Sequence, residues 1–118
     1  MAVQHYFGGC QCGAVRYEVD ADLDHTVTCN CSRCRKLGAI LTFAPESAFK
    51  LVSGEGATTE YLFNTRKIHH LFCSTCGIQS FSRGAAPDGT AMVAINARCL
   101  DGVDVKSLTP VEHDGASH

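Results

Sequence analysis

Cysteine is the residue type whose number and spacing first suggest chemistry in this sequence. Eight of the 118 residues are cysteine, and seven of these stand in three short groups. The groups read C-x-C, C-x-C-x-x-C and C-x-x-C, and they are formed in that order by Cys10 and Cys12, by Cys29, Cys31 and Cys34, and by Cys73 and Cys76. Cysteines two or three residues apart in a tight turn can direct two sulfurs to one ion, so this spacing predicts thiolate metal sites.

Zinc is the metal that we expect, with two ions per chain, because tetrahedral Zn²⁺ suits sulfur ligands. An iron–sulfur cluster is an alternative that soft thiolate ligands also allow. Four disulfides are a further alternative, although disulfide frameworks usually scatter their cysteines more widely. The N-terminal residues MAVQHYFGG lack the apolar region of a signal peptide. We therefore expect a cytoplasmic protein whose thiols stay reduced.

The first and last cysteine groups together predict a closed, structural zinc site. The ion would join a turn near the N-terminus to a turn about 60 residues later. Such a clip contributes directly to folding, because the unfolded chain does not contain the site ready-made. The expected ligands of the structural zinc are Cys10, Cys12, Cys73 and Cys76.

The middle group predicts a second zinc site with an open position. Three protein ligands and one open position are usual in catalytic zinc sites, where the fourth place holds water or a substrate thiol. Cys99, His69 or His70 could instead close the tetrahedron, although Cys99 is most simply a small buried apolar residue. The expected catalytic residues, which are also the ligands of this second zinc, are Cys29, Cys31 and Cys34.

Three basic residues lie within or beside the middle group, namely Arg33, Arg35 and Lys36. Cations near thiolates lower the pKa of the thiols, and an arginine can bind a carboxylate through two parallel hydrogen bonds. We therefore expect these residues to bind the carboxylates of an anionic substrate. A solvated basic turn is the alternative interpretation.

The elements that must position these residues are mostly strands. Short apolar or alternating runs separated by Gly, Pro, Asp and Ser predict an all-β fold of small sheets with little helix. We expect one zinc-binding domain over residues 1–118, with a polar and frayed tail from about residue 112. Strands are predicted over residues 13–20, 25–30, 39–43, 49–52, 58–64, 67–72, 78–83 and 91–96.

Two local features complete this prediction. The strands over 58–64 and 67–72 form a hairpin around Thr65 and Arg66, and residues 45–48 form one helical turn that begins at Pro45. No stretch of the sequence has the apolar spacing of a long amphipathic helix.

Composition excludes two classes of partner. Ten basic and twelve acidic residues give a net charge of −2, which argues against nucleic-acid binding because that binding depends on neutralising phosphates. No apolar run approaches the roughly 18 residues of a membrane span, so we expect no membrane association. The expected partner is a small molecule.

Three segments of the sequence resemble a known family in order and spacing. They are GGCQCGAVRYEV, CNCSRCRKLGA and HHLFCSTCGIQSF, and the later stretch VAINARCLDGVDVKSL is also similar to that family. The family is that of the glutathione-dependent formaldehyde-activating enzymes, which also includes centromere protein V. The resemblance extends over about residues 5–114.

The resemblance implies a fold of coiled β-sheets of the β-tent group and two zinc sites with the ligands given above. It also implies a carbon–sulfur lyase that joins formaldehyde to glutathione as S-hydroxymethylglutathione. The substrates are implied by the resemblance and not by the spacing of the cysteines. A non-enzymatic zinc module that binds a protein partner, as centromere protein V suggests, and a thiol redox protein are the alternative functions.

Overall fold

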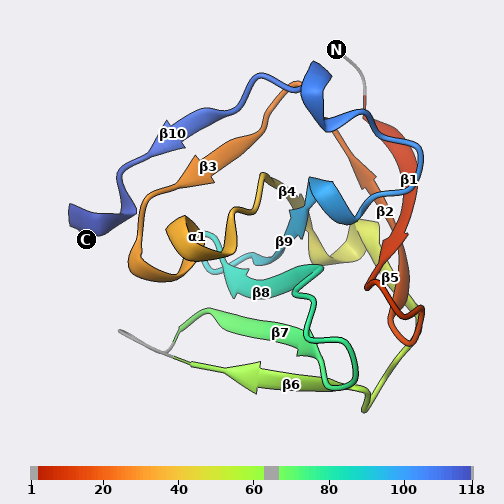
Figure 1. Cartoon of the computed structure of the whole chain (residues 1–118). Helices are drawn as coiled ribbons and strands as arrows, with labels where there is room; N and C mark the ends of the chain where they lie inside the picture. Colours follow the sequence, from red (N-terminus) through yellow and green to blue (C-terminus); the bar gives the residue numbers. More distant parts are fainter. Residues whose placement is uncertain (1–2, 63–66, 118) are drawn as a thin grey trace.

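The computed structural model describes residues 3–62 and 67–117, and in this part of the chain strands predominate (Figure 1). The strands are β1 (Gln4–Gly9), β2 (Arg16–Ala21), β3 (Val27–Cys29), β4 (Leu41–Pro45), β5 (Phe49–Ser53), β6 (Thr58–Tyr61), β7 (His69–Cys73), β8 (Phe81–Ala85), β9 (Ala91–Asn96) and β10 (Val111–His113). The helical elements are α1 (Ser32–Leu37) and the 3-10 turns η1 (Glu46–Ala48), η2 (Ala97–Cys99), η3 (Val105–Ser107) and η4 (Gly115–Ser117). The expected all-β class with little helix is confirmed.

A small antiparallel sheet has the strand order β1-β2-β5. The predicted alternation in β2 is confirmed, because Tyr17, Val19 and Ala21 are buried while Asp20 on the opposite face is exposed. Strand β1 was not predicted. Its apolar and polar residues do not alternate, and it ends in two glycines, so its pairing with β2 rather than its own pattern makes it a strand.

A larger sheet has the order β10-β3-β4-β9-β8-β7-β6 (Figure 1). Its neighbours are antiparallel, except that β10 runs parallel to β3. Strands β6 and β7 pair as the predicted hairpin, with Thr58 opposite Cys73. The predicted turn at Thr65 and Arg66 lies outside the described residues.

The core lies where the small sheet packs against the larger one. Tyr17 of β2, Phe49 of β5 and Phe81 of β8 form an aromatic cluster with ring centroids 4.9–5.7 Å apart. Val93 and Ile95 of β9 are fully buried beside this cluster. Burial of such side chains is the main favourable contribution to folding, at roughly 1.5–3 kcal/mol each.

The short helix α1 replaces the turn that the spacing of the middle cysteines suggested. Cys31 caps its N-terminus by accepting a hydrogen bond from the Cys34 amide, and Gly38 ends it with a left-handed φ of 74°. Six residues are too few to produce the apolar repeat that predicts a helix from sequence. The helical turn expected at residues 45–48 is confirmed as η1.

The expectation of a frayed tail is wrong for the first residues of that tail. Glu112 and His113 belong to β10, which pairs with β3, and the amide of Asn30 donates to the carbonyl oxygen of His113 over 3.2 Å. The side chains of β10 are all exposed. Backbone pairing, which leaves no hydrophobic pattern in the sequence, therefore orders this segment.

Among the residues that the structure describes, every helix is too short and too polar to cross a membrane.

Candidate metal centres

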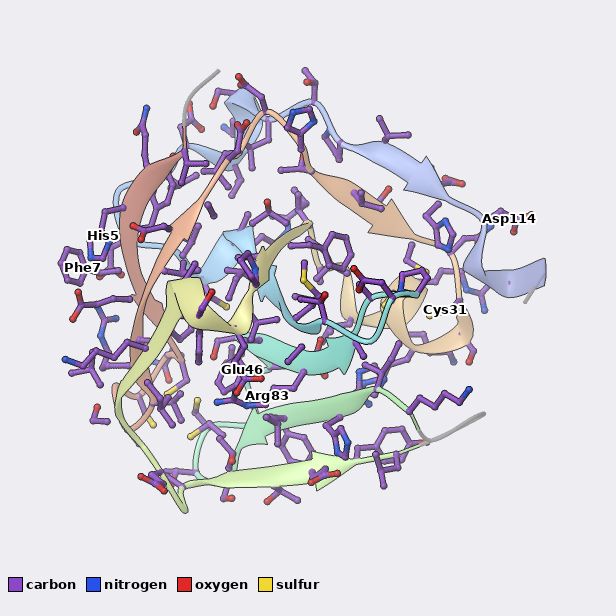
Figure 2. The ribbon with its side chains drawn as sticks, turned by 180° about the vertical axis from the view of Figure 1, so that it is seen from behind. His5, Phe7, Cys31, Glu46, Arg83 and Asp114 are labelled. Atoms are coloured by element: carbon purple, nitrogen blue, oxygen red, sulfur yellow. The ribbon has the colours of Figure 1, made fainter. Side chains whose placement is uncertain are left out.

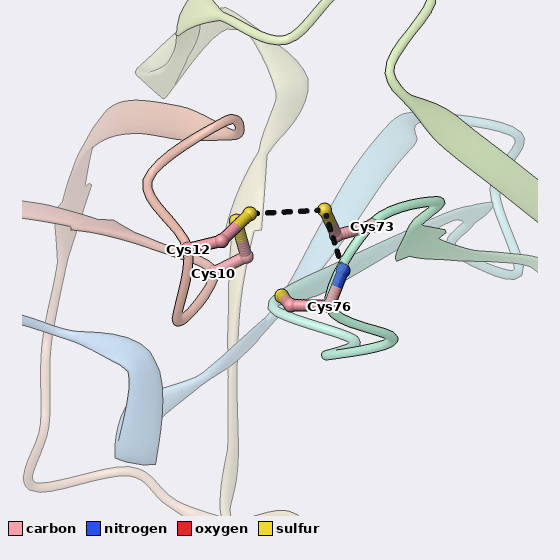
Figure 3. A group of neighbouring side chains, drawn as sticks. All are labelled: Cys10, Cys12, Cys73 and Cys76. Atoms are coloured by element: carbon pink, nitrogen blue, oxygen red, sulfur yellow. Dashed lines mark hydrogen bonds between the residues drawn. The ribbon is translucent and has the colours of Figure 1, made fainter.

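The first candidate centre brings together four cysteines from two loops that are far apart in the sequence (Figure 3). Cys10 and Cys12 lie directly after β1, Cys73 ends β7, and Cys76 lies in the turn that follows. The sulfurs of Cys12 and Cys73 are 3.6 Å apart, those of Cys10 and Cys12 are 3.7 Å apart, and all four lie within 4.8 Å of one another. A tetrahedral zinc ion with Zn–S bonds of about 2.3 Å holds its sulfurs about 3.8 Å apart. The geometry of this four-sulfur group therefore fits zinc.

Two tight turns direct these sulfurs toward one another. Gly13 and Gly77 adopt φ angles of 86° and 81°, which residues with a Cβ atom rarely adopt. In the second turn the amide of Gly77 donates to the carbonyl of Cys73, and the amide of Cys73 donates to the carbonyl of Ile78. Both C-x-C and C-x-x-C thus lie in loops closed by backbone hydrogen bonds.

Backbone amides stabilise the negative charge that a metal ligand requires. The amide of Val15 donates to the sulfur of Cys10 over 3.3 Å, and the amide of Cys76 donates to that of Cys73 over 3.5 Å. Hydrogen bonds from the amides of Ile78 and Cys12 lower the pKa of Cys76 to about 6. The hydrogen bond from the Cys76 amide likewise lowers the pKa of Cys73. Thiolates bind metal ions, so these contacts favour metal binding by Cys73 and Cys76.

The second candidate centre is built from the end of β3 and the start of α1. The sulfurs of Cys29, Cys31 and Cys34 lie within 4.8 Å of one another, and each residue is half-buried. Within the described ranges, no fourth His, Cys, Asp or Glu donor joins this three-sulfur group. Three sulfurs and a free coordination position fit zinc in the arrangement that catalytic sites use.

The three sulfurs differ in their electrostatic surroundings. Burial raises the pKa of Cys34 to about 12, and the hydrogen bond and negative charge of Cys31 contribute to this rise. Burial also acts on Cys31, but hydrogen bonds, led by the one from the Cys34 amide, outweigh it and lower the pKa of Cys31. Cys31, which Figure 2 labels, is therefore the sulfur of this pair that ionises first.

The residues suggested as closing ligands lie elsewhere. His69 pairs with Glu60 on the neighbouring strand β6. His70 is buried on β7, where burial and the charge of Arg33 lower its pKa. Cys99 is half-buried rather than buried, and its pKa rises to about 11 through burial and through Cys10 and Cys76. Cys99 belongs to neither sulfur group.

Helix α1 places two of its three basic residues at a cavity. The guanidinium group of Arg33 lies over the ring of Tyr61, with its central carbon 4.7 Å from the ring centroid. Arg33, Lys36 and Tyr61 line a cavity of about 410 Å³ together with Ser32 and Leu37. Arg35 is exposed, and it does not belong to this lining.

A residue that the sequence analysis missed fixes Arg33 in place. Nε and Nη2 of Arg33 both donate to Oε1 of Gln79, over 3.1 and 2.5 Å. Gln79 also lines a second cavity of about 460 Å³, which shares Leu37 with the first. Gln79 follows the C-x-x-C pattern by three residues, but a glutamine there carries no motif that identifies it.

Comparison with known proteins agrees with the resemblance seen in the motifs. Residues 5–114 match the glutathione-dependent formaldehyde-activating enzyme family. The fold is similar to the crystal structure of a protein from Rhodobacter sphaeroides, with 35% sequence identity and a TM-score of 0.80. That similarity covers 90% of this chain and 97% of the other. The match extends over nearly the whole sequence, and the chain belongs to the glutathione-dependent formaldehyde-activating enzyme family.

Proposed function

We propose that this protein is a zinc-dependent carbon–sulfur lyase that joins a small thiol to an aldehyde and cleaves the adduct in the reverse direction. Family membership supports glutathione as the thiol and formaldehyde as the aldehyde. The observation that carries the proposal is the three-sulfur group, which has no fourth donor in the described part of the chain. A purely structural site would be closed, whereas a reacting thiol needs a free coordination position.

The two cysteine groups have different roles in this proposal. Cys29, Cys31 and Cys34 would hold a zinc ion, which when bound would lower the pKa of a substrate thiol. Three anionic sulfurs give the site a net negative charge, which favours delivery of a thiolate over polarisation of a carbonyl. Cys10, Cys12, Cys73 and Cys76, whose sulfurs lie within 4.8 Å of one another, would hold the structural zinc.

The reaction is an addition to a carbonyl group. The substrate thiol loses its proton to water, and its sulfur attacks the aldehyde carbon to form the carbon–sulfur bond. The π electron pair of the carbonyl moves to oxygen, which takes a proton from water. The product is a hemithioacetal, which for formaldehyde is the S-hydroxymethyl adduct, and no oxidant or reductant is required. Because free thiols are needed throughout, we expect the protein to act in a reducing compartment such as the cytoplasm.

Arg33 and Lys36 are the residues of this chain that we expect to hold the thiol substrate. Both line the cavity beside α1, and Arg33 is fixed by Gln79 and by the ring of Tyr61. A guanidinium group held in one orientation loses little conformational freedom when it binds a carboxylate. Glutathione carries two carboxylates, so Lys36 offers a cation to the second of them.

Line broadening in NMR tests this function directly. Zinc-loaded protein should broaden the hydroxymethyl signal of an equilibrated mixture of glutathione and formaldehyde, because catalysed exchange shortens the lifetime of the adduct. The Cys31→Ser variant should leave the signal sharp while the protein remains folded. Cys99→Ser, which changes a half-buried sulfur outside both groups, is the matched control and should broaden the signal like the unmodified protein. A sharp signal with protein that holds two zinc ions per chain would contradict the proposal.

A further inference from the structure

The C-terminal segment, defined here as residues 111–117, lies against the strand that carries Cys29. His113 of β10 is the register partner of Cys29 in β3. The amide of Asn30 donates to the carbonyl of His113 over 3.2 Å, so the pairing continues one residue past the end of β3. Figure 2 shows Asp114 on the same side of the molecule as Cys31. Residues 111–117 thus return to the three-sulfur group.

One side chain between the cysteines holds this segment at two points. Nδ2 of Asn30 donates to Oδ1 of Asp114 over 3.0 Å. Oδ1 of Asn30 accepts from the amide of Ala116 over 2.9 Å. Asn30 occupies the x position of the C-x-C formed by Cys29 and Cys31. Its amide group therefore connects the metal-binding turn to the residues on both sides of Gly115.

Gly115 lies directly over the sulfur of Cys29. A Cβ atom at residue 115 would be 2.5 Å from Sγ of Cys29 and 3.3 Å from Cβ of Cys31. The φ of Gly115 lies outside the left-handed region, so glycine is required here for space and not for backbone conformation. Gly115 also lies just beyond residue 114, where the match to the family ends.

We propose that Gly115 is a positioning residue for the three-sulfur site. The C-terminal segment forms one wall of the site, covers Cys29 Sγ and fixes the direction of that sulfur. Exogenous thiols and metal ions then reach the group from the side away from residues 111–117. The proposal rests on the proposed function for its catalytic meaning, but the contact between Gly115 and Cys29 is independent of it.

Alkylation of individual cysteines tests this contact in the full chain. Reduced protein, as purified and with its metal content measured, is treated with limiting iodoacetamide and each cysteine is quantified by mass spectrometry. In Gly115→Ala, the added methyl group displaces either the segment or the sulfur. Because overpacking of this kind typically costs 1–3 kcal/mol, the alkylation of Cys29 relative to Cys34 should rise about fivefold or more.

Gly84→Ala is the matched control, because Gly84 has no left-handed φ and a Cβ there would meet its nearest neighbour at an ordinary 3.7 Å. This variant should leave the ratio of Cys29 to Cys34 alkylation unchanged. Asn30→Ala removes both side-chain hydrogen bonds without adding bulk, so it should raise the same ratio. An unchanged ratio in both Gly115→Ala and Asn30→Ala overturns the proposal.

A competition assay with a chromophoric chelator separates this proposal from the proposed function. In Gly115→Ala, one of two zinc ions should bind about tenfold more weakly, which corresponds to about 1.4 kcal/mol, while the other keeps its affinity. Equal weakening of both ions would indicate general destabilisation and would overturn the positioning role. If the unmodified protein holds one zinc ion, the proposed function fails, whereas the alkylation ratio still decides the role of Gly115.

Discussion

Arg33 and Gln79 join helix α1 to the segment that follows Cys76. They are 46 residues apart in the sequence, and two nitrogens of the guanidinium group converge on one amide oxygen. Gln79 is only 6% exposed, and its backbone carbonyl oxygen accepts a hydrogen bond from Nδ2 of Asn96. The cation next to the three-sulfur group is thus held by a buried amide that the four-sulfur turn positions.

Removing this amide should weaken substrate binding more than turnover. In Gln79→Leu, Arg33 loses its acceptor and samples other rotamers, so the KM for glutathione should rise about tenfold, or about 1.4 kcal/mol, while kcat changes little. Steady-state kinetics of the thiol–aldehyde reaction measure both constants. Arg35→Ala is the comparison on the same helix and should change KM less than twofold, because Arg35 is exposed and does not line the cavity. The reverse order of effects would show that Arg35 binds the substrate.

Breaking the four-sulfur group should destabilise the whole fold. Cys73→Ser removes one of the four sulfurs proposed to join, through a zinc ion, the turn after β1 to the turn after β7. We expect the thermal midpoint to fall by about 15 °C or more, since 1 kcal/mol moves it by about 4 °C in a domain of this size. Circular dichroism during heating, with zinc analysis of the same sample, measures this change.

The matched variant Cys31→Ser should lose zinc from the other group and lower the midpoint by only a few degrees. The three cysteines of that group lie within six residues of one another. A metal ion bound to them would therefore close only a short loop and would constrain the unfolded chain little. Equal destabilisation by both substitutions would contradict the division into a structural and a reactive site.

The cysteine groups could be predicted from sequence because short spacings act locally. Two thiols within four residues converge whenever the backbone turns, and the structure gathers the same seven sulfurs that the spacing selected. The eight predicted strands are all present, with boundaries shifted by up to three residues. Apolar residues alternate with polar ones where one face of a strand is buried. This burial also holds the strands in place, so the pattern in the sequence predicts them.

The features that sequence did not reveal depend on contacts between distant segments. Strand β10 is held by backbone pairing to β3 while its side chains are exposed. The role of Gln79 is visible only in its hydrogen bonds with Arg33, and that of Gly115 only in its close approach to the sulfur of Cys29. None of these contacts leaves a period or a motif in the chain. A single sequence therefore predicts the sulfur ligands but not the residues that surround them.

Tyr17 connects the small sheet to the loop that carries Gln79. Its hydroxyl group donates to the carbonyl oxygen of Ser80 over 3.0 Å, and the residue is 1% exposed. Tyr17→Phe keeps the packing of the ring but leaves that carbonyl without the hydrogen bond, which should cost about 1–2 kcal/mol of unfolding free energy. Urea denaturation measures this loss.

Tyr6→Phe is the matched control for Tyr17→Phe. The Tyr6 hydroxyl group makes a long 3.5 Å contact to Gln4 at the exposed side of β1. Its removal should change the unfolding free energy by less than about 0.5 kcal/mol. An equally small effect of Tyr17→Phe would show that water replaces the hydroxyl group at Ser80.

His5 should make stability depend on pH through two carboxylates on the outer face of the small sheet. Its ring nitrogens form hydrogen bonds with Asp20 over 2.7 Å and with Glu18 over 2.8 Å. Both bonds raise the pKa of His5, and the bond to Asp20 contributes more than the bond to Glu18. A raised pKa in the folded state means that folding takes up a proton. The stabilisation is therefore complete below the unfolded value of about 6.5 and fades as the pH rises through the raised pKa.

His5→Gln should consequently lower the unfolding free energy at pH 5.5 and have little effect at pH 9. Urea denaturation of both proteins at the two pH values measures the difference. Asp20→Asn, which removes the charge of the stronger partner but keeps an oxygen acceptor, should reduce the pH dependence without abolishing it, because Glu18 remains. If His5→Gln destabilises equally at both pH values, packing of the ring against Phe7, 5.1 Å away between centroids, explains its contribution instead of charge.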